Sequence, residues 1–216
     1  MRKLTRGWRL TIFTMLLVAL VGCGEESGAL STPSTTPSSS VKTDITPDPS
    51  SPPTLSQSTI DTYLKVMNEQ RTKAGGQDCG HYGHFDPAPP LGWSDELYHA
   101  SYEHSYDMAK SDWFSHDGSG SANDWTSQVQ SLGRGSKMDE RAENNNYTNW
   151  RYLGENIAAG TDMDEAREAV IGWMNSPDHC KNMMNPNFKE VGLSVVYDEN
   201  SYYKYYWTQD FGTKQY

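Results

Sequence analysis

The sequence has few cysteines, few basic residues and no apolar run of membrane-spanning length. Three of its 216 residues are cysteines, and 18 Lys and Arg face 28 Asp and Glu, which gives a net charge of −10. This deficit of positive charge argues against nucleic acid as a partner and against docking to anionic lipid through a basic surface. The apolar stretch at residues 11–21 is shorter than the roughly 20 residues that a transmembrane helix needs.

The first 23 residues follow the pattern of an export signal. Four basic residues in the first nine precede the apolar stretch, as in a secretory signal peptide. Leu20-Val21-Gly22-Cys23 then resembles the bacterial lipobox, whose cysteine is lipidated and begins the mature chain. We therefore expect residues 1–22 to be a lipoprotein signal peptide. Acyl chains on Cys23 would anchor an extracytoplasmic protein to the cell membrane or to an outer membrane.

A polar tether is expected to follow the anchor, over residues 23–58. Of the 28 residues at 31–58, 21 are Ser, Thr or Pro, a composition that buries too little apolar surface to fold. The remaining residues, 59–216, are enough for one domain of ordinary size.

Helical and strand patterns are mixed within this domain. Helices are predicted at residues 58–73, after an N-cap at Ser94, after a capping box of Asp162 and Glu165, and after Ser176-Pro177; alternating strands are predicted at 191–197 and 203–211. Residues 122–150 are polar, and their later part is predicted to be a surface excursion. His104 is predicted to be a hydrogen-bonded core histidine, and His99 and Glu103 to form a solvated contact. The order of elements indicates a layered α/β/α domain.

Two cysteines remain if Cys23 is lipidated. A pair in an oxidising compartment most often forms a disulfide, here Cys79–Cys180. The alternative is a catalytic thiolate at Cys180, next to His179 in the sequence.

The segment RYLGENIAAG, residues 151–160, contains a carboxylate that needs a charged partner. It places Glu155 among small and apolar residues, where an unpaired carboxylate is costly. His116 and His179 lie in two other distinctive segments, FSHDG and GWMNSPDHC. Two histidines and a carboxylate suit a catalytic zinc ion, although no two of them share a short motif such as HExxH.

The segments resemble those of the CAP superfamily, also called SCP/TAPS, which includes cysteine-rich secretory proteins, venom allergens and plant pathogenesis-related proteins. The closer likeness is to bacterial CAP-domain lipoproteins. The resemblance covers roughly residues 59–213 and rests on six motifs in order: Leu91-Gly92-Trp93, His104 to Met108, Phe114-Ser115-His116, Gly154 to Gly160, Gly172 to His179, and Tyr206 to Gly212.

The resemblance implies a three-layer α-β-α sandwich with a central antiparallel sheet and a large cleft. In eukaryotic members the cleft holds two His and two Glu that can bind a divalent metal; here His116, Glu155 and His179 match three of them. The second Glu falls at Ser176, which cannot supply the charge. Bacterial members with comparable cysteines support the Cys79–Cys180 disulfide.

Two functions stay open at this point. The first is a lipid-anchored binding module of the cell envelope, using the cleft around His116, Glu155 and His179 for a small molecule, lipid or envelope component. The alternative is a metal-dependent, peptidase-like hydrolase in the same cleft, for which zinc is the candidate divalent metal. A third interpretation treats the trio as a structural ion-pair cluster. A monomer is expected.

Overall fold

The computed structural model describes residues 48–215. The predicted signal peptide, the lipidation site Cys23 and most of the predicted tether lie outside the described residues. Within residues 48–215, no helix is long and apolar enough to cross a membrane.

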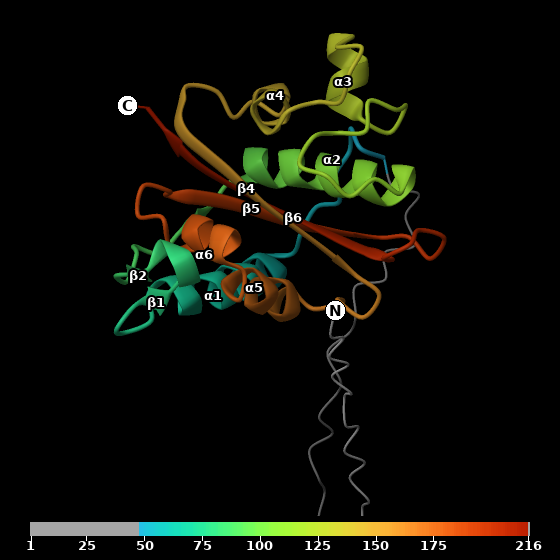
Figure 1. Cartoon of the computed structure of the whole chain (residues 1–216). Helices are drawn as coiled ribbons and strands as arrows, with labels where there is room; N and C mark the ends of the chain where they lie inside the picture. Colours follow the sequence, from blue (N-terminus) through green and yellow to red (C-terminus); the bar gives the residue numbers. More distant parts are fainter. Residues whose placement is uncertain (1–47, 216) are drawn as a thin grey trace, which may run out of the picture. The chain divides into compact units, whose positions relative to one another are not determined.

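Three layers make up the described part of the chain (Figure 1). Helix α2 lies on one face of a four-stranded sheet with α3 and α4 beyond it, and α1, α5 and α6 lie on the other face. In chain order the elements are α1 Gln57–Arg71, β1 Gln77–Asp78, a 3-10 turn Gly80–Tyr82, β2 His84–Phe85, β3 Gly92–Trp93, α2 Asp95–Ser111, α3 Trp125–Gln130, α4 Met138–Asn144, β4 Trp150–Gly160, α5 Ala166–Met174, α6 Pro177–Met184, β5 Glu190–Tyr197 and β6 Tyr205–Lys214. The predicted α-β-α sandwich is confirmed.

The main sheet has the strand order β3-β5-β6-β4. Its long pairs, β5 with β6 and β6 with β4, are antiparallel as predicted, whereas the short strand β3 pairs parallel to β5. The alternation of apolar and polar residues at 191–197 and 203–211 therefore correctly predicted an antiparallel hairpin of two strands.

The two faces of the sheet are covered differently. The face toward α1, α5 and α6 is packed with large apolar side chains, including Trp173, Trp207 and Phe211. The face toward α2 mixes apolar residues with buried polar ones, such as Ser105, whose hydroxyl lies 2.9 Å from both the Ser194 and Thr208 hydroxyls. This polar layer is where the candidate site forms.

Gly192 allows α2 to approach the sheet closely. A Cβ atom at this position would lie 2.0 Å from the Tyr98 backbone nitrogen, inside α2. Only glycine fits between β5 and the first turns of α2 without moving the helix.

The predicted disulfide is present. Cys79 and Cys180 are bonded, with a Cα–Cα distance of 5.4 Å, and both are buried. The bond links the loop after β1 to α6, so Cys180 is a structural residue and not a thiolate nucleophile.

Several local predictions were wrong. Helix α5 is capped by Glu165, which forms its capping box with Glu168, and not by Asp162. The polar region 122–150, for which the sequence predicted no regular element, contains the short helices α3 and α4, and residues 145–149 form a loop after them. Glu103 is buried and accepts hydrogen bonds from the Thr126 amide and the Asn145 side chain, so it makes no solvated contact with His99. The Tyr98 hydroxyl donates to the Pro53 carbonyl at 2.8 Å, so α2 also contacts a residue before position 59.

Candidate functional site

Strand pairing places two carboxyl groups side by side in the polar layer. Glu155 on β4 and Asp210 on β6 are register partners. Successive side chains of a strand point to opposite faces, so Glu155 shares the α2 face with Ile157, which packs against α2 residues in the core. Both carboxyl groups are buried.

Glu155 has a basic partner on each carboxylate oxygen. His116 Nδ1 lies 2.7 Å from Oε1, and an Arg141 guanidinium nitrogen lies 2.6 Å from Oε2. The Glu155 side chain is 3% exposed, so these two partners replace its lost hydration. This arrangement explains how the small and apolar segment GENIAAG carries a carboxylate.

The pKa of Glu155 reflects this pairing. Burial alone would raise the pKa, but the charge of Arg141, followed by the electrostatic effect of His104 and by the hydrogen bond from His116, outweighs burial and lowers the pKa to about 2. Glu155 is therefore a carboxylate at neutral pH.

His116 is the surface-facing member of the cluster. Its side chain is 56% exposed, and the hydrogen bond to Glu155 raises the pKa of its imidazole, against a smaller opposing effect of burial. Because Nδ1 faces Glu155, Nε2 is the nitrogen available to a molecule at the surface.

His104 is the buried histidine of the cluster. Its Nε2 lies 2.9 Å from the Ser115 carbonyl and 3.9 Å from Glu155 Oε1. Burial, followed by the charge of Arg141, lowers the pKa of His104 to about 4, so its imidazole is neutral and Nε2 donates to Ser115. The predicted hydrogen-bonded core histidine is confirmed, and the segment Ser115-His116 is thereby fixed to α2.

Arg141 is a central residue that the sequence did not reveal. It is 1% exposed and donates to the carbonyls of Ser136 and His116 as well as to Glu155. In the sequence, Arg141 lies within the acidic run DERAEN, a pattern that is typical of a solvated helix face. The available signal was Glu155 itself, since a buried carboxylate requires a cation nearby.

Asp210 is the second residue that was missed. Neither of its oxygens accepts a hydrogen bond from the residues that the structure describes. Burial, followed by the negative charge of Glu155, raises the pKa of Asp210 well above its ordinary value, so the folded protein favours the protonated form of this carboxyl beside the Glu155 carboxylate. Alternation along β6 puts Asp210 on the face opposite Phe211, but only its pairing with Glu155 on β4 makes it part of the site.

We expect Asp210→Asn to raise the free energy of unfolding at neutral pH, with a gain that grows as the pH rises. The pKa of Asp210 is raised from its ordinary value of 3.8, so the folded protein keeps a proton that the unfolded chain has lost. The wild type therefore loses stability as the pH rises from about 4 toward the folded-state pKa, and asparagine does not. Urea denaturation from pH 4 to pH 8 measures the difference, with exposed Asp61→Asn as control. A difference that is constant with pH contradicts the assignment.

His179 lies beside the cluster and not within it. It occupies the first turn of α6 and is partly buried. Burial and the charge of nearby His116 lower the pKa of its imidazole, which keeps it neutral. Among the described residues no hydrogen bond or ion pair joins His179 to Glu155. Ser176, at the position of the expected second Glu, is the residue before α6.

The residues do not fit a metal ion bound through Glu155. One carboxylate oxygen faces the guanidinium of Arg141, and a cation there would meet its repulsion. Across residues 48–215, no group of three or more His, Cys, Asp or Glu side chains is placed to hold a metal. The zinc ligands expected from the sequence are thus not assembled around a common point, and we derive no reaction step through a metal.

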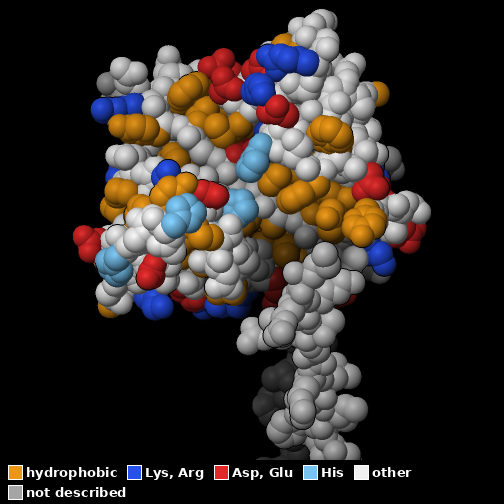
Figure 2. All heavy atoms as spheres, in the orientation of Figure 1, with side chains coloured by type: hydrophobic (Ala, Val, Ile, Leu, Met, Phe, Trp, Pro, Cys, Tyr) orange, Lys and Arg blue, Asp and Glu red, His pale blue; other side chains and the backbone are white. Residues whose placement is uncertain are grey.

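Exposed aromatic side chains adjoin His116. Trp113 and Phe114 are 49% and 46% exposed, and Phe114 meets Tyr203 edge to face with ring centres 5.9 Å apart. Asp112 holds this segment to the β5–β6 turn by accepting from the Tyr202 amide and the Tyr206 hydroxyl. Figure 2 shows histidine side chains and a band of hydrophobic side chains on the same face of the molecule.

The sandwich and the His–Glu site together define a domain of the CAP type. The sequence profile of the CAP family, described as the cysteine-rich secretory protein family, matches residues 64–211, more than half of the chain. The chain belongs to this family.

Individual relatives agree with this assignment. The Bacillus subtilis protein YkwD is 42% identical over 62 residues, which are 29% of this chain and 21% of that protein. An extracellular protein containing a SCP domain from Bacillus anthracis is 25% identical, with a TM-score of 0.50, over 73% of this chain and 41% of that chain. An outer surface protein from Borrelia burgdorferi shares the fold, with a TM-score of 0.52 and 16% identity over 74% of this chain and 95% of that chain. The chain thus spans less than half of the two Bacillus proteins.

Proposed function

We propose that this protein is an exported, lipid-anchored binding module of the cell envelope whose ligand contacts His116, Trp113 and Phe114. The observation that carries the proposal is the buried Glu155, which holds the half-exposed imidazole of His116 and raises its pKa, next to two exposed aromatic rings. The signal and lipobox pattern at residues 1–23 supports export and anchoring through Cys23, and the Bacillus anthracis relative is an extracellular protein.

The side chains favour an amphipathic ligand with a hydrogen-bond acceptor. The rings of Trp113 and Phe114 present large apolar surface, and aromatic side chains lose little conformational entropy on binding. The Nε2–H of a protonated His116 would donate a charge-assisted hydrogen bond to the acceptor. No nucleophile is required for this function, which is consistent with a Glu155 carboxylate engaged on both oxygens.

We expect Trp113→Ala to weaken ligand binding by about 10- to 30-fold, in the range of central aromatic contacts at binding sites. The purified protein is incubated with a total lipid extract and with soluble envelope glycan fragments, and retained molecules are identified by native mass spectrometry and titrated. Trp125→Ala, an exposed tryptophan on α3, is the matched control. Retention of no lipid or glycan by the wild type, or an equal loss in Trp125→Ala, overturns the proposal.

A further inference from the structure

A hollow lies away from His116, at the end of the sheet where β4 begins and β6 ends. Its volume is about 800 Å³, within the range of small-molecule sites. Its lining comes from β4, from the loop between α6 and β5, and from the end of β6: Arg151, Tyr152, Pro186, Asn187, Lys189, Thr213, Lys214 and Gln215. We call it the basic hollow.

The charge of this lining is opposite to that of the chain. Three of the eight lining residues are basic and none is acidic, although the chain as a whole carries −10. Lys214 forms an ion pair with Glu96, with 3.1 Å between the Lys214 Nζ and the Glu96 Oε1. Within residues 48–215, Arg151 and Lys189 form no ion pair, so their charges are uncompensated.

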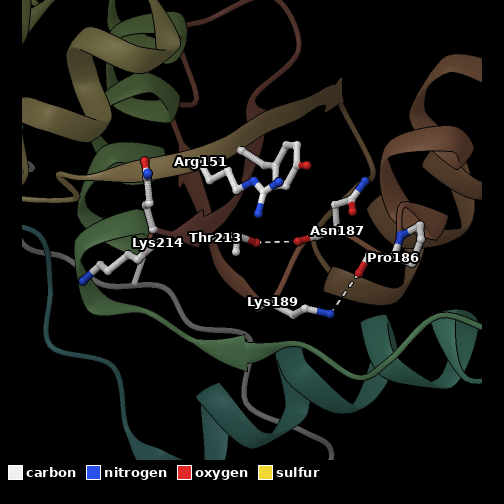
Figure 3. Close-up of a pocket in the computed structure, with 8 residues that line it drawn as sticks. Arg151, Pro186, Asn187, Lys189, Thr213 and Lys214 are labelled. Atoms are coloured by element: carbon white, nitrogen blue, oxygen red, sulfur yellow. Dashed lines mark hydrogen bonds between the residues drawn. The ribbon is translucent and has the colours of Figure 1, made fainter.

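The backbone aims Arg151 at the hollow. Trp150 pairs with Lys214 and Tyr152 pairs with Thr213, so Arg151 is an extra residue with no partner on β6. Such a bulge redirects a side chain, and bulges often occur next to functional sites. Figure 3 shows Arg151, on β4, and Asn187, in the loop between α6 and β5, among the residues that line the hollow, with the hydrogen bond from the Thr213 hydroxyl to the Asn187 carbonyl beneath them.

The cations are also restrained in position. The Arg151 guanidinium lies 5.3 Å from the centre of the Tyr152 ring, and Lys189 Nζ donates to the Pro186 carbonyl at 3.0 Å. Restraint before binding lowers the entropy lost when a ligand is captured. The Arg151 guanidinium also matches phosphate or carboxylate oxygens in a two-pronged geometry.

We propose that the basic hollow binds an organic anion carrying two or more phosphate or carboxylate groups. Arg151 would take one anionic group and Lys189 another, with the Asn187 amide donating between them. The site is separate from that of His116, and it does not depend on the function proposed there.

Calorimetric titration of the purified protein with tripolyphosphate and with citrate, at low salt, tests the proposal. We expect saturable one-to-one binding of at least one anion, and the preferred anion identifies phosphate or carboxylate as the recognised group. Arg151→Gln should weaken binding about tenfold, since it removes a charge-assisted pair. Lys189→Gln should weaken it by a smaller factor.

Arg167→Gln is the matched control, because Arg167 is an exposed arginine on α5 that pairs with Glu69. It should leave the affinity within twofold, as should Trp113→Ala. The absence of saturable binding of both anions to the wild type overturns the proposal. An equal loss in Arg151→Gln and Arg167→Gln also overturns it, because it would indicate attraction by general charge.

Discussion

Replacing Arg141 with methionine is expected to lower the free energy of unfolding by about 3 to 5 kcal/mol, the range seen when one partner of a buried ion pair is removed. Arg141 is 1% exposed and supplies the cation for Glu155 Oε2. Without it, the Glu155 carboxylate would be buried beside Asp210 with only His116 as a charged partner. Urea denaturation at pH 7 gives the difference directly.

A second variant separates lost charge compensation from lost packing. Arg141→Met combined with Glu155→Gln removes both charges, so the pair is expected to be more stable than Arg141→Met alone. Arg167→Met, at an exposed ion pair on α5, should change stability by less than about 1 kcal/mol. If Arg141→Met is as mild as Arg167→Met, Glu155 does not depend on Arg141.

Replacing Cys79 and Cys180 together with serine is expected to lower the free energy of unfolding by about 4 to 5 kcal/mol. The two residues are 101 positions apart, and a cross-link over such a loop removes much of the conformational freedom of the unfolded chain. Thermal or urea unfolding of the wild type and the double variant, both without reductant, measures the loss.

Reduction provides an independent check on the same bond. Wild-type protein in excess dithiothreitol should approach the stability of the double variant, whereas the double variant should not respond. Equal stability of oxidised and reduced wild type contradicts the prediction. Ser176→Ala, close to Cys180 in sequence, is the control for local disturbance of α6.

The fold was predictable where periodicity and capping agree. The strand at 191–197 alternates, and Ser94 caps α2 by accepting from the Leu97 amide as its position suggests. The predicted start of α5 was wrong because two capping boxes of equal spacing overlap there, Asp162 with Glu165 and Glu165 with Glu168. The tertiary structure selects the later one: the Met163 carbonyl accepts from the Trp207 indole at 2.7 Å, which keeps that residue outside the helix.

The candidate site was only half visible in the sequence. His116 and Glu155 stand out because a histidine and a carboxylate interrupt distinctive small and apolar segments. Arg141 does not, because nothing in a polar helix marks one arginine as buried. Asp210 became recognisable only through the pairing of β4 with β6, since its effect arises from Glu155, its partner on a strand far earlier in the chain.

The order of strands has a consequence for how the protein is made. Strand β6 lies between β5 and β4, so the sheet has no stable interior until the final strand has been synthesised. A nascent chain ending before Tyr205 would expose the edges of both β4 and β5 and lack their shared neighbour. We therefore expect the sheet to form only after β6 has been translated, so that a nascent chain carrying β4 and β5 alone stays open at both of these strands.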